Sequence, residues 1–267
     1  MLRLKNIQDI LFEFAYEMML LDAVGESCPA RPLLVHAALW EPVSPVVVLG
    51  RHSRLKDEVF LEPVYADGVS VLRRTTGGTP VLVAPGMLCL GLVFGARDYG
   101  TLEWRQTLER VLAGIAEVLR RLGPSVRYEY PADLAVGDRK VVGSAARTAD
   151  GALLFHASIL CDAPLELVAR YLPKPRYEPP YRRGRDHGNF LTNLGVDPAK
   201  VAEALAETFS PVRCPITLED AQLEPLARHY GSATWLALGS PLRPAQRTVL
   251  DAAFAVADGF SERRRGV

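Results

Sequence analysis

Apolar side chains recur at helical spacing over one long segment near the middle of the chain, from Thr101 to Leu122. They fall at intervals of three, four and seven residues, so they would share one face of a helix. These residues are Leu108, Val111, Leu112, Ile115, Val118, Leu119 and Leu122. Gly123 and Pro124 follow directly and form a typical helix end. The pattern predicts an amphipathic helix here. Similar patterns predict helices at 6–23, 163–172, 198–209, 217–230 and 243–258.

Shorter apolar runs bounded by Gly, Pro or Asp predict strands. These runs are Leu33–Leu39, Val46–Leu49, Val69–Arg73, Val81–Val83, Leu88–Phe94, Asp133–Val136, Lys140–Val142 and Leu153–Cys161. They come in clusters and do not alternate regularly with helices. We therefore expect an α+β fold with a mixed, mostly antiparallel sheet flanked by helices, and not a doubly wound parallel sheet. The Pro-rich run at 173–180, with the basic residues up to 188, predicts a long irregular loop, and such loops are often functional.

Composition and charge narrow the class of protein. The chain has 267 residues, of which 49% are hydrophobic and 23% are charged, as in ordinary globular proteins. Basic and acidic residues number 31 each, so the basic excess of a nucleic-acid binder is missing. No apolar stretch approaches the roughly 18 to 20 residues that span a bilayer, and the first helix does not read as a secretion signal. We expect a cytoplasmic protein that binds neither nucleic acid nor membrane.

The cysteines are widely spaced. Cys28, Cys89, Cys161 and Cys214 form no CxxC pair. This spacing is typical neither of a zinc site nor of a secreted disulfide framework.

A glycine turn follows a predicted strand in the segment from Arg73 to Val81, RRTTGGTPV. Consecutive glycines, here Gly77 and Gly78, let the backbone approach a ligand closely and direct N–H groups at an anion. Arg73 and Arg74 add charge suited to phosphate or carboxylate. A plain hairpin turn with exposed arginines is the alternative, and this segment alone does not exclude it.

The segment DLAVGDRKVVGSA, at 133–145, predicts a hairpin with a two-residue turn at Gly137 and Asp138. In that register Asp133 and Lys140 lie on one face, within side-chain reach. The chain has only five lysines, so a lysine here is not an effect of composition. A compact ammonium could hold a phosphate and a carboxylate together while charge builds up in a transfer reaction. A surface salt bridge is the alternative.

A single histidine, His156, interrupts the apolar strand LFHASIL at 154–160. A lone histidine in such a strand is more often a satisfied core residue than a catalyst, so on its own it predicts little.

In their order and spacing, these segments resemble the motifs of the lipoate–protein ligase and lipoyl/octanoyl transferase family. The family pattern reads roughly R-R-x-S-G-G-G-x-V-x-H, then D-L-x-V-x-G-x-K-x-x-G-S-A, then H-H-G-T-L-L. Here the corresponding blocks are RRTTGGTPVLV, DLAVGDRKVVGSA and FHASIL. Further likenesses are Trp40, the segment Gly50-Arg51-His52-Ser53, Glu58-Val59, Thr192-Asn193-Leu194, and His229 to Trp235. The resemblance spans about residues 6 to 240.

The resemblance implies a class II aminoacyl-tRNA synthetase/biotin ligase-like catalytic domain over 1–240, followed by a C-terminal helix or tail over 241–267. It implies an ATP-dependent ligase that uses Mg²⁺ and activates lipoate or octanoate as an acyl adenylate. The acyl group then passes to a lysine of a lipoyl domain, as in 2-oxoacid dehydrogenase acyltransferase subunits, the glycine cleavage H protein or a similar lipoate-binding protein. The tail is too short for the accessory domain that many such ligases carry, so a separate accessory subunit is a further expected partner.

The same resemblance assigns roles to individual residues. Lys140 would be the catalytic lysine that touches both phosphate and acyl carbonyl. The expected substrate and nucleotide contacts are Arg74, Thr76, Gly77, Gly78, Thr79, Asp133, Gly143, Ser144, His156 and Ala157. Loop contacts are expected from Arg182, Arg185 and Asn193, and no protein residue is expected to bind a metal.

The sequence departs from the family pattern around the glycine loop. Thr79 stands at the third glycine position, where a β-branched residue resists positive φ, and Pro80 removes an N–H donor. The other departures are Val83 for histidine, Ala84 for an acidic residue, Met87 for asparagine and Ala157 for glycine. We expect all of them to line one pocket, and either to shift its acyl or nucleotide preference or to reduce activity.

Octanoyl transferases of this family carry the acyl group on a cysteine, either shortly before the D-L-x-V block or in the loop before the T-N-L-like segment. None of the four cysteines here falls at either place, so a cysteine thioester is disfavoured. Biotin ligase is disfavoured too, because its G-R-G-R-x-G-type loop is absent. An ATP-independent lipoyl or octanoyl transferase and a non-catalytic ligand-binding member remain the alternatives.

Overall fold

Two β-sheets organise the chain in the computed structural model, which describes residues 2–24, 28–97, 101–149, 151–212 and 220–238. Within these residues the strands form a seven-stranded and a three-stranded sheet. The large sheet has the order β1 (Arg3–Lys5), β2 (Leu33–Pro42), β6 (Met87–Gly95), β10 (Ala152–Leu160), β9 (Arg139–Ala149), β8 (Asp133–Val136) and β7 (Val126–Glu129). The small sheet has the order β4 (Ser70–Arg73), β3 (Val46–Leu49) and β5 (Val81–Val83). Strand β1 runs parallel to β2 and β4 parallel to β3, while the other pairs are antiparallel. The predicted α+β fold with a mixed, mostly antiparallel sheet is confirmed.

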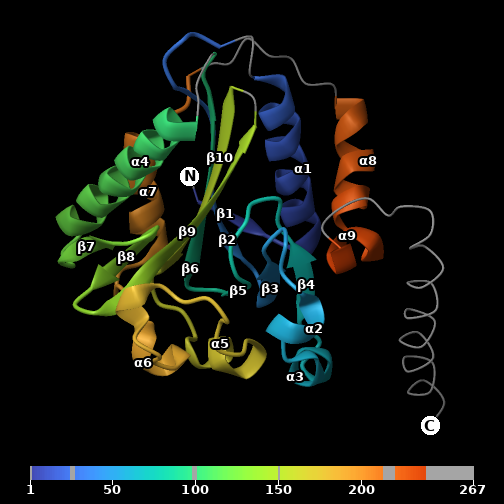
Figure 1. The fold of residues 1–267 in the computed structure, drawn as a ribbon, viewed down its shortest axis with the longest axis vertical. Coiled ribbons are helices and arrows are strands. Elements are labelled where there is room, and N and C mark those ends of the chain that lie inside the picture. The colour runs from blue at the N-terminus through green and yellow to red at the C-terminus, as the bar shows by residue number, and fades with distance from the viewer. Residues whose placement is uncertain (1, 25–27, 98–100, 150, 213–219, 239–267) are drawn as a thin grey trace.

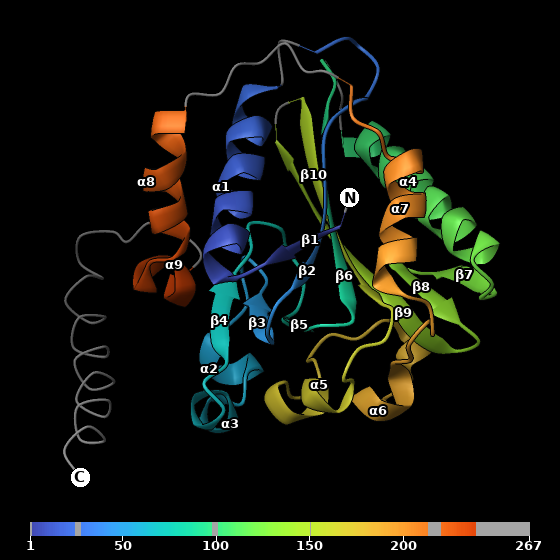
Figure 2. The same ribbon diagram turned by 180° about the vertical axis from the view of Figure 1, so that it is seen from behind.

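Helices cover both faces of the large sheet (Figures 1 and 2). On one face lie α4 (Thr101–Arg121) and α7 (Pro198–Thr208). On the other lies α1 (Ile7–Ala23), against which α8 (Asp220–Tyr230) packs. The shorter elements are α2 (Leu55–Glu58), α3 (Leu61–Ala66), α5 (Glu166–Tyr171), a 3₁₀ turn (Pro180–Arg182), α6 (His187–Phe190) and α9 (Ala233–Leu238).

Strand β6 shows why the sequence of a central strand is continuously apolar. Leu88, Leu90 and Leu92 point into the core shared with α4. The alternate residues Cys89 and Val93 point into the core shared with α1. Because both faces of this strand are covered, neither set of alternate positions can be polar.

Helix α1 begins at a capping box, in which Asn6 and Asp9 bond each other's backbone N–H groups. Its buried stripe includes Phe14, Met18 and also Glu17, which is only 1% exposed. The helix therefore directs one carboxylate toward the sheet.

Next to its turn the hairpin β8–β9 has the predicted register, and the register shifts by one residue between Leu134 and Ala135. Val136 pairs with Arg139 and Ala135 with Lys140, and Gly137 has the positive φ of 58° that its turn requires. Strand β9 is longer than predicted, because it continues to Ala149 along β10. Small residues after Val142 concealed that continuation in the sequence.

Several short elements were not predicted, namely β1, β7, α2, α3, α6 and α9. Each has only three to six residues, which is too few for a period to emerge. The predicted helix at 243–258, the tail at 241–267, the first residues of the predicted helix at 217–230, and Cys214 lie outside the described residues. In the described part of the chain, every helix is too short or too polar to cross a membrane.

Candidate functional site

Two cavities meet at Lys140. Cavity A, of about 450 Å³, lies between the two sheets and α1. Cavity B, of about 370 Å³, lies between the small sheet and the loop at 172–191. The residues that line both are Thr79, Val81, Lys140, Gly143, Ser158 and Tyr177.

Lys140 is held in place by Asp133. Its Nζ lies 2.8 Å from Asp133 Oδ1, and Asp133 is 6% exposed. Tyr181 donates its hydroxyl hydrogen to Asp133 Oδ2 at 2.9 Å. Burial and the adjacent carboxylate raise the pKa of Tyr181, so the phenol keeps its proton and remains a donor. The hairpin thus presents one ammonium at the junction of the cavities.

Cavity A has largely apolar walls contributed by α1, β2, β3, β5 and β6. The apolar residues that line it include Phe14, Trp40, Val48, Val83, Cys89 and Leu90. Such a cavity can bury a medium-length acyl chain. Its polar and charged lining includes Glu17, Arg74, His156, Asp133 and Lys140.

The buried side chain of Arg74 bonds several groups of the segment Thr76–Thr79, the glycine loop. Its guanidinium donates to the carbonyl oxygens of Val48, Gly77 and Thr79 at 3.2, 2.5 and 3.0 Å, and to Thr76 Oγ1 at 3.1 Å. Burial and the neighbouring Arg73 lower the pKa of Arg74 to about 10, so it stays charged at neutral pH. This cation shapes the loop that borders cavity A.

The loop places its positive φ at Gly78, where φ is 88°. Gly50 approaches so closely that a Cβ atom on it would lie 1.8 Å from Gly78 O. The expected conflict at Thr79 does not arise, because Thr79 has no positive φ. Thr79 therefore replaces the third glycine of the family pattern without backbone strain.

Arg73 does not line either cavity, although its place in the sequence suggested a ligand contact. It bonds backbone carbonyl groups instead. It is 1% exposed and donates to Gly50 O, Ser53 O and Leu236 O at 2.7 to 2.9 Å. Trp235 Nε1 donates to Arg73 O at 2.8 Å. Arg73 fastens α9 to the strand that leads into the glycine loop, and the alternative of exposed arginines is wrong.

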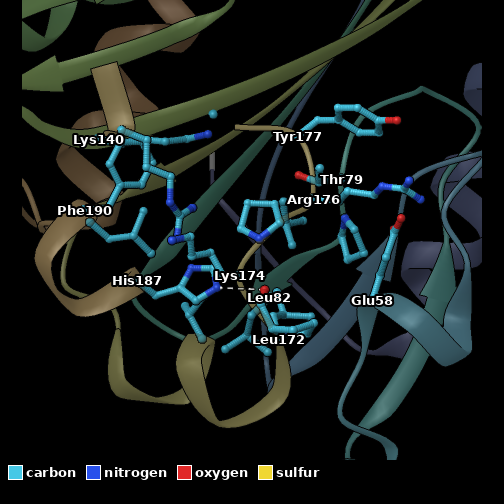
Figure 3. Close-up of a pocket in the computed structure, with 18 of the residues that line it drawn as sticks. Glu58, Thr79, Leu82, Lys140, Leu172, Lys174, Arg176, Tyr177, His187 and Phe190 are labelled. Carbon is cyan, nitrogen blue, oxygen red and sulfur yellow. Dashed lines mark hydrogen bonds between the residues drawn. The ribbon is translucent and has the colours of Figure 1, made fainter. Parts of the chain in front are cut away.

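Cavity B has a basic lining. Lys174, Arg176, Arg182 and His187 line it together with Lys140, and in Figure 3 Lys140 and Tyr177 lie at one end and Leu172 at the other.

Arg182 is 3% exposed and stacks 4.6 Å from the Phe190 ring centroid. Its Nη2 is buried without a hydrogen-bond partner among the described residues. A buried, unpaired guanidinium N–H is suited to an anionic ligand.

Glu58 also lines cavity B, and its Oε2 atom is buried without a hydrogen-bond partner in the described part of the chain. An oxygen of this kind can accept a hydrogen bond or ligate a hard cation.

Most of the predicted site residues come together. Those lining cavity A are Arg74, Gly78, Thr79, Asp133, Lys140, Gly143, Ser144, His156 and Ala157. Thr76 and Gly77 lie directly behind them, bonded to Arg74. Arg182 lines cavity B.

Arg185 and Asn193 lie outside both cavities. Arg185 bonds Asp138 and Tyr181 O, and Asn193 bonds the backbone N–H and C=O of Ala163. Both side chains brace loops in this structure.

From the sequence, all departures from the family pattern were expected to line one pocket. They do not. Val83 and Ala157 line cavity A, whereas Met87 lines cavity B and Thr79 lines both. Ala84 lines neither and is fully buried in the core beside β5.

Glu17 was missed by the sequence analysis. It bonds His156 Nε2 at 2.7 Å and lines cavity A. A signal existed, because a carboxylate on the apolar stripe of an amphipathic helix needs a partner.

One described group could offer metal ligands. Atoms of Glu13, Glu17 and His36 lie within 4.8 Å of one another. Lys5 already pairs with Glu13, and His36 Nε2 lies 2.7 Å from Glu13 Oε1. These partners satisfy the Glu13 carboxylate, so we assign no metal to this group.

The described cysteines are not reactive. Cys28, Cys89 and Cys161 are all buried. Burial raises the pKa of Cys89 strongly and that of Cys161 to about 12. Both therefore carry a neutral thiol, which is a poor nucleophile, at neutral pH.

Comparison with known proteins gives a consistent picture. The sequence profile described as "lipoyl protein ligase A/B catalytic domain" matches residues 9–210. A putative lipoate-protein ligase A from Aeropyrum pernix is 38% identical over 125 residues, which are 46% of this chain and only 45% of that protein. The octanoyltransferase LipM from Geobacillus kaustophilus is 28% identical over 84% of this chain and 92% of its own length.

Solved structures share the fold. A lipoate-protein ligase A bound with ATP matches with a TM-score of 0.69 at 21% identity, over 90% of this chain and 98% of that one. A bi-partite lipoate protein ligase from Thermoplasma acidophilum, studied with its E2 lipoyl domain, matches with a TM-score of 0.69 at 20% identity, over 91% and 98%.

Proposed function

This chain belongs to the lipoyl protein ligase A/B catalytic-domain family, and from that premise we propose that it is an ATP-dependent lipoate–protein ligase. The observation that carries the proposal is the position of Lys140, at the junction of an apolar and a basic cavity. An acyl adenylate has an apolar tail and an anionic nucleotide joined at one phosphoanhydride. An ammonium at the junction would contact both the phosphate and the acyl oxygen.

In this proposal cavity A takes the lipoyl or octanoyl chain and cavity B takes the nucleotide. The carboxylate attacks the α-phosphorus of ATP, a bond to pyrophosphate breaks, and the acyl adenylate forms. A lysine amine of a lipoyl domain then attacks the acyl carbon, and AMP leaves. Charge grows on the phosphate and acyl oxygens in these steps, where a fixed ammonium is most effective.

Asp133 and Tyr181 support Lys140 in both steps. Asp133 fixes the position of the ammonium through an ion pair of 2.8 Å. Arg182, which lines cavity B and has a buried, unpartnered Nη2, would supply a guanidinium to phosphate there.

A magnesium ion commonly accompanies ATP chemistry, and cavity B contains a suitable ligand. Mg²⁺ is usually bound by one or two carboxylates together with substrate phosphates. The Glu58 carboxylate, with its buried, unpartnered Oε2, fits that role among the described residues. When bound, the ion would neutralise phosphate charge.

The proposed acceptor is a lipoyl domain. Tyr130 and Tyr177 line cavity A, as Lys140 does, and are 62% and 78% exposed. An acceptor lysine can approach the junction between them. The Thermoplasma ligase with the same fold was studied with an E2 lipoyl domain, which supports this class of partner.

Intact-mass measurement tests the proposal. A lipoyl domain is incubated with the protein, ATP, Mg²⁺ and free lipoate, and the lipoyl mass increment is expected only when ATP is present. A matched reaction with octanoate reports the acyl preference. No increment with either acid, in the presence of intact folded protein, would contradict the ligase assignment.

A transferase that moves an acyl group between proteins without ATP is the second candidate, because the LipM relative matches 84% of this chain. The same assay separates the two, since a transferase would label the acceptor from an octanoylated donor protein without ATP. A binding member without catalysis would bind lipoyl-AMP and label nothing.

A further inference from the structure

A buried chain of hydrogen bonds crosses the wall of cavity A, from the glycine loop to helix α1. Arg74 Nε donates to Thr76 Oγ1 at 3.1 Å. Thr76 Oγ1 lies 3.1 Å from His156 Nδ1, and His156 Nε2 lies 2.7 Å from Glu17 Oε2. Thr76 is 0% exposed and Glu17 is 1% exposed, so both hydrogen-bond partners of His156 are buried.

The two ends of this chain fix its direction. A guanidinium can only donate, and an ionised carboxylate can only accept. His156 Nε2 must therefore carry the hydrogen that reaches Glu17. The Thr76 oxygen accepts from Arg74 and is the hydrogen-bond partner of His156 Nδ1. The imidazole therefore lies between the buried guanidinium of Arg74, which it reaches through Thr76, and the buried carboxylate of Glu17.

The contact between Glu17 and His156 depends on a glycine. Gly91 on β6 lies opposite His156 on β10. A Cβ atom on Gly91 would lie 2.1 Å from Glu17 Oε1. Only a residue without a side chain lets the carboxylate of α1 reach the imidazole, while the Phe14 ring packs 5.8 Å away.

We propose that Glu17, His156 and Thr76 are positioning residues that fix the glycine loop against the wall of the acyl cavity. Arg74 is the link, because the guanidinium that donates to Thr76 also bonds Gly77 O and Thr79 O. Glu17, Arg74 and His156 all line cavity A, so a bound acyl chain lies against this network. The identity of that ligand rests on the proposed function, whereas the hydrogen-bond network does not.

The tautomer of His156 is a direct test. In a chain labelled with ¹⁵N-histidine, His156 is one of five histidines, and the signal that disappears in His156→Gln identifies it. We expect a protonated Nε2 and a hydrogen-bonded Nδ1. Thr76→Val should shift the Nδ1 resonance, because that nitrogen loses its hydrogen-bond partner, and Thr76→Ser should restore it. A wild-type imidazole protonated only at Nδ1, or an Nδ1 resonance that Thr76→Val leaves unchanged, would overturn the proposal.

A neighbouring threonine supplies the matched control for function. Thr75 is also 0% exposed, but its Oγ1 has no hydrogen-bond partner among the described residues. Thr76→Val should raise the KM for lipoate by about 5- to 10-fold, the effect of one lost hydrogen bond, with little change in kcat. Thr75→Val should change neither parameter. Equal effects of the two substitutions, or a loss confined to kcat, would reject a positioning role.

Failure of this proposal can be told apart from failure of the proposed function. If the wild-type protein transfers no acyl group, the ligase assignment fails. The imidazole spectra still test the hydrogen-bond network around His156. Calorimetric binding of lipoate then replaces KM, with the same expected contrast between the variants of Thr76 and Thr75.

Discussion

Lys140 folds back over Gly143, so that a Cβ atom on Gly143 would lie 2.7 Å from both Cε and Nζ of the lysine. The same Nζ lies 2.8 Å from Asp133 Oδ1. In this hairpin the glycine leaves open the space that the catalytic ammonium of the proposed reaction occupies.

Removing or displacing that ammonium should suppress transfer. Lys140→Ala should cost about 3 kcal/mol or more in transition-state free energy, because charge on the phosphate and acyl oxygens loses its counter-charge. Gly143→Ala keeps the lysine but pushes it aside, and we expect a fall in kcat of up to about 100-fold. Gly188→Ala is the control, because its Cβ would meet only Asp186 Oδ1, at 3.8 Å. Near-wild-type kcat in Lys140→Ala would remove Lys140 from the mechanism.

The glycine loop predicts unequal effects at two adjacent positions. Gly78 has φ of 88°, and a Cβ on it would lie 2.9 Å from Arg74 Nη2. Gly78→Ala should lower the free energy of unfolding by about 1 to 3 kcal/mol. At Gly77 a Cβ would meet no described atom within 4 Å, and φ is not positive, so Gly77→Ala should be neutral or slightly stabilising. Urea denaturation of both variants measures the difference, and equal losses would contradict the assigned loop geometry.

The sequence was informative where a local rule determines the structure. The period of Thr101–Leu122 predicted α4, and the two-residue turn at Gly137 placed Lys140 beside Asp133 in the observed register. Family motifs then identified nine of the residues that line cavity A. These inferences needed only residues that are neighbours along the chain or members of one motif.

Contacts between distant segments could not be predicted in this way. Glu17 meets His156 across 139 positions of sequence, through a gap left by Gly91. The direction of Arg73, into carbonyl groups near Gly50 and α9, depends equally on tertiary packing. Asn193 and Arg185 were expected to make loop contacts, and in this structure their hydrogen-bonding groups brace loops. Likeness in sequence identifies a residue's position but not what its side chain bonds.

Acyl transfer should proceed without a thioester on the described cysteines. Burial raises the pKa of Cys89 and Cys161, the latter to about 12, so the thiolate is scarce at neutral pH. In a Cys214→Ala background, iodoacetamide at pH 7.5 should leave the folded protein unmodified and label Cys28, Cys89 and Cys161 after denaturation. Intact mass reads both states. A hydroxylamine-sensitive acyl adduct on the folded chain would instead favour the transferase.

Acid stability should depend on Glu13. Burial alone raises the pKa of this carboxyl, but the hydrogen bond from His36 and the charges of Lys5 and His36 outweigh burial and lower the pKa from 4.5 to about 2. A depressed folded-state pKa stabilises the protein above the unfolded value, and that contribution is lost as pH falls from about 4.5 to 2. Its upper limit is about 3 kcal/mol. Glu13→Gln should therefore flatten the fall in unfolding free energy over this range, measured by urea titration at successive pH values. An unchanged slope would show that Glu13 is not the titrating group.

The assignment of cavity B to the nucleotide can be tested with two arginines of the same loop. Arg182 lines the cavity and has a buried, unpartnered Nη2, whereas Arg185 bonds Asp138 and Tyr181 O outside it. Lysine keeps the positive charge but cannot reproduce the guanidinium fork. Arg182→Lys should therefore raise the KM for ATP by about 10-fold or more, as expected for one lost charge-assisted hydrogen bond. Arg185→Lys should change the KM for ATP by less than about twofold, because its partners are not ligands.

Calorimetric binding of a non-hydrolysable ATP analogue measures the same contrast without turnover, and melting temperatures confirm that both variants fold. Equal affinities, together with acceptor labelling from an octanoylated donor without ATP, would assign the basic cavity to another anion and make the chain a transferase.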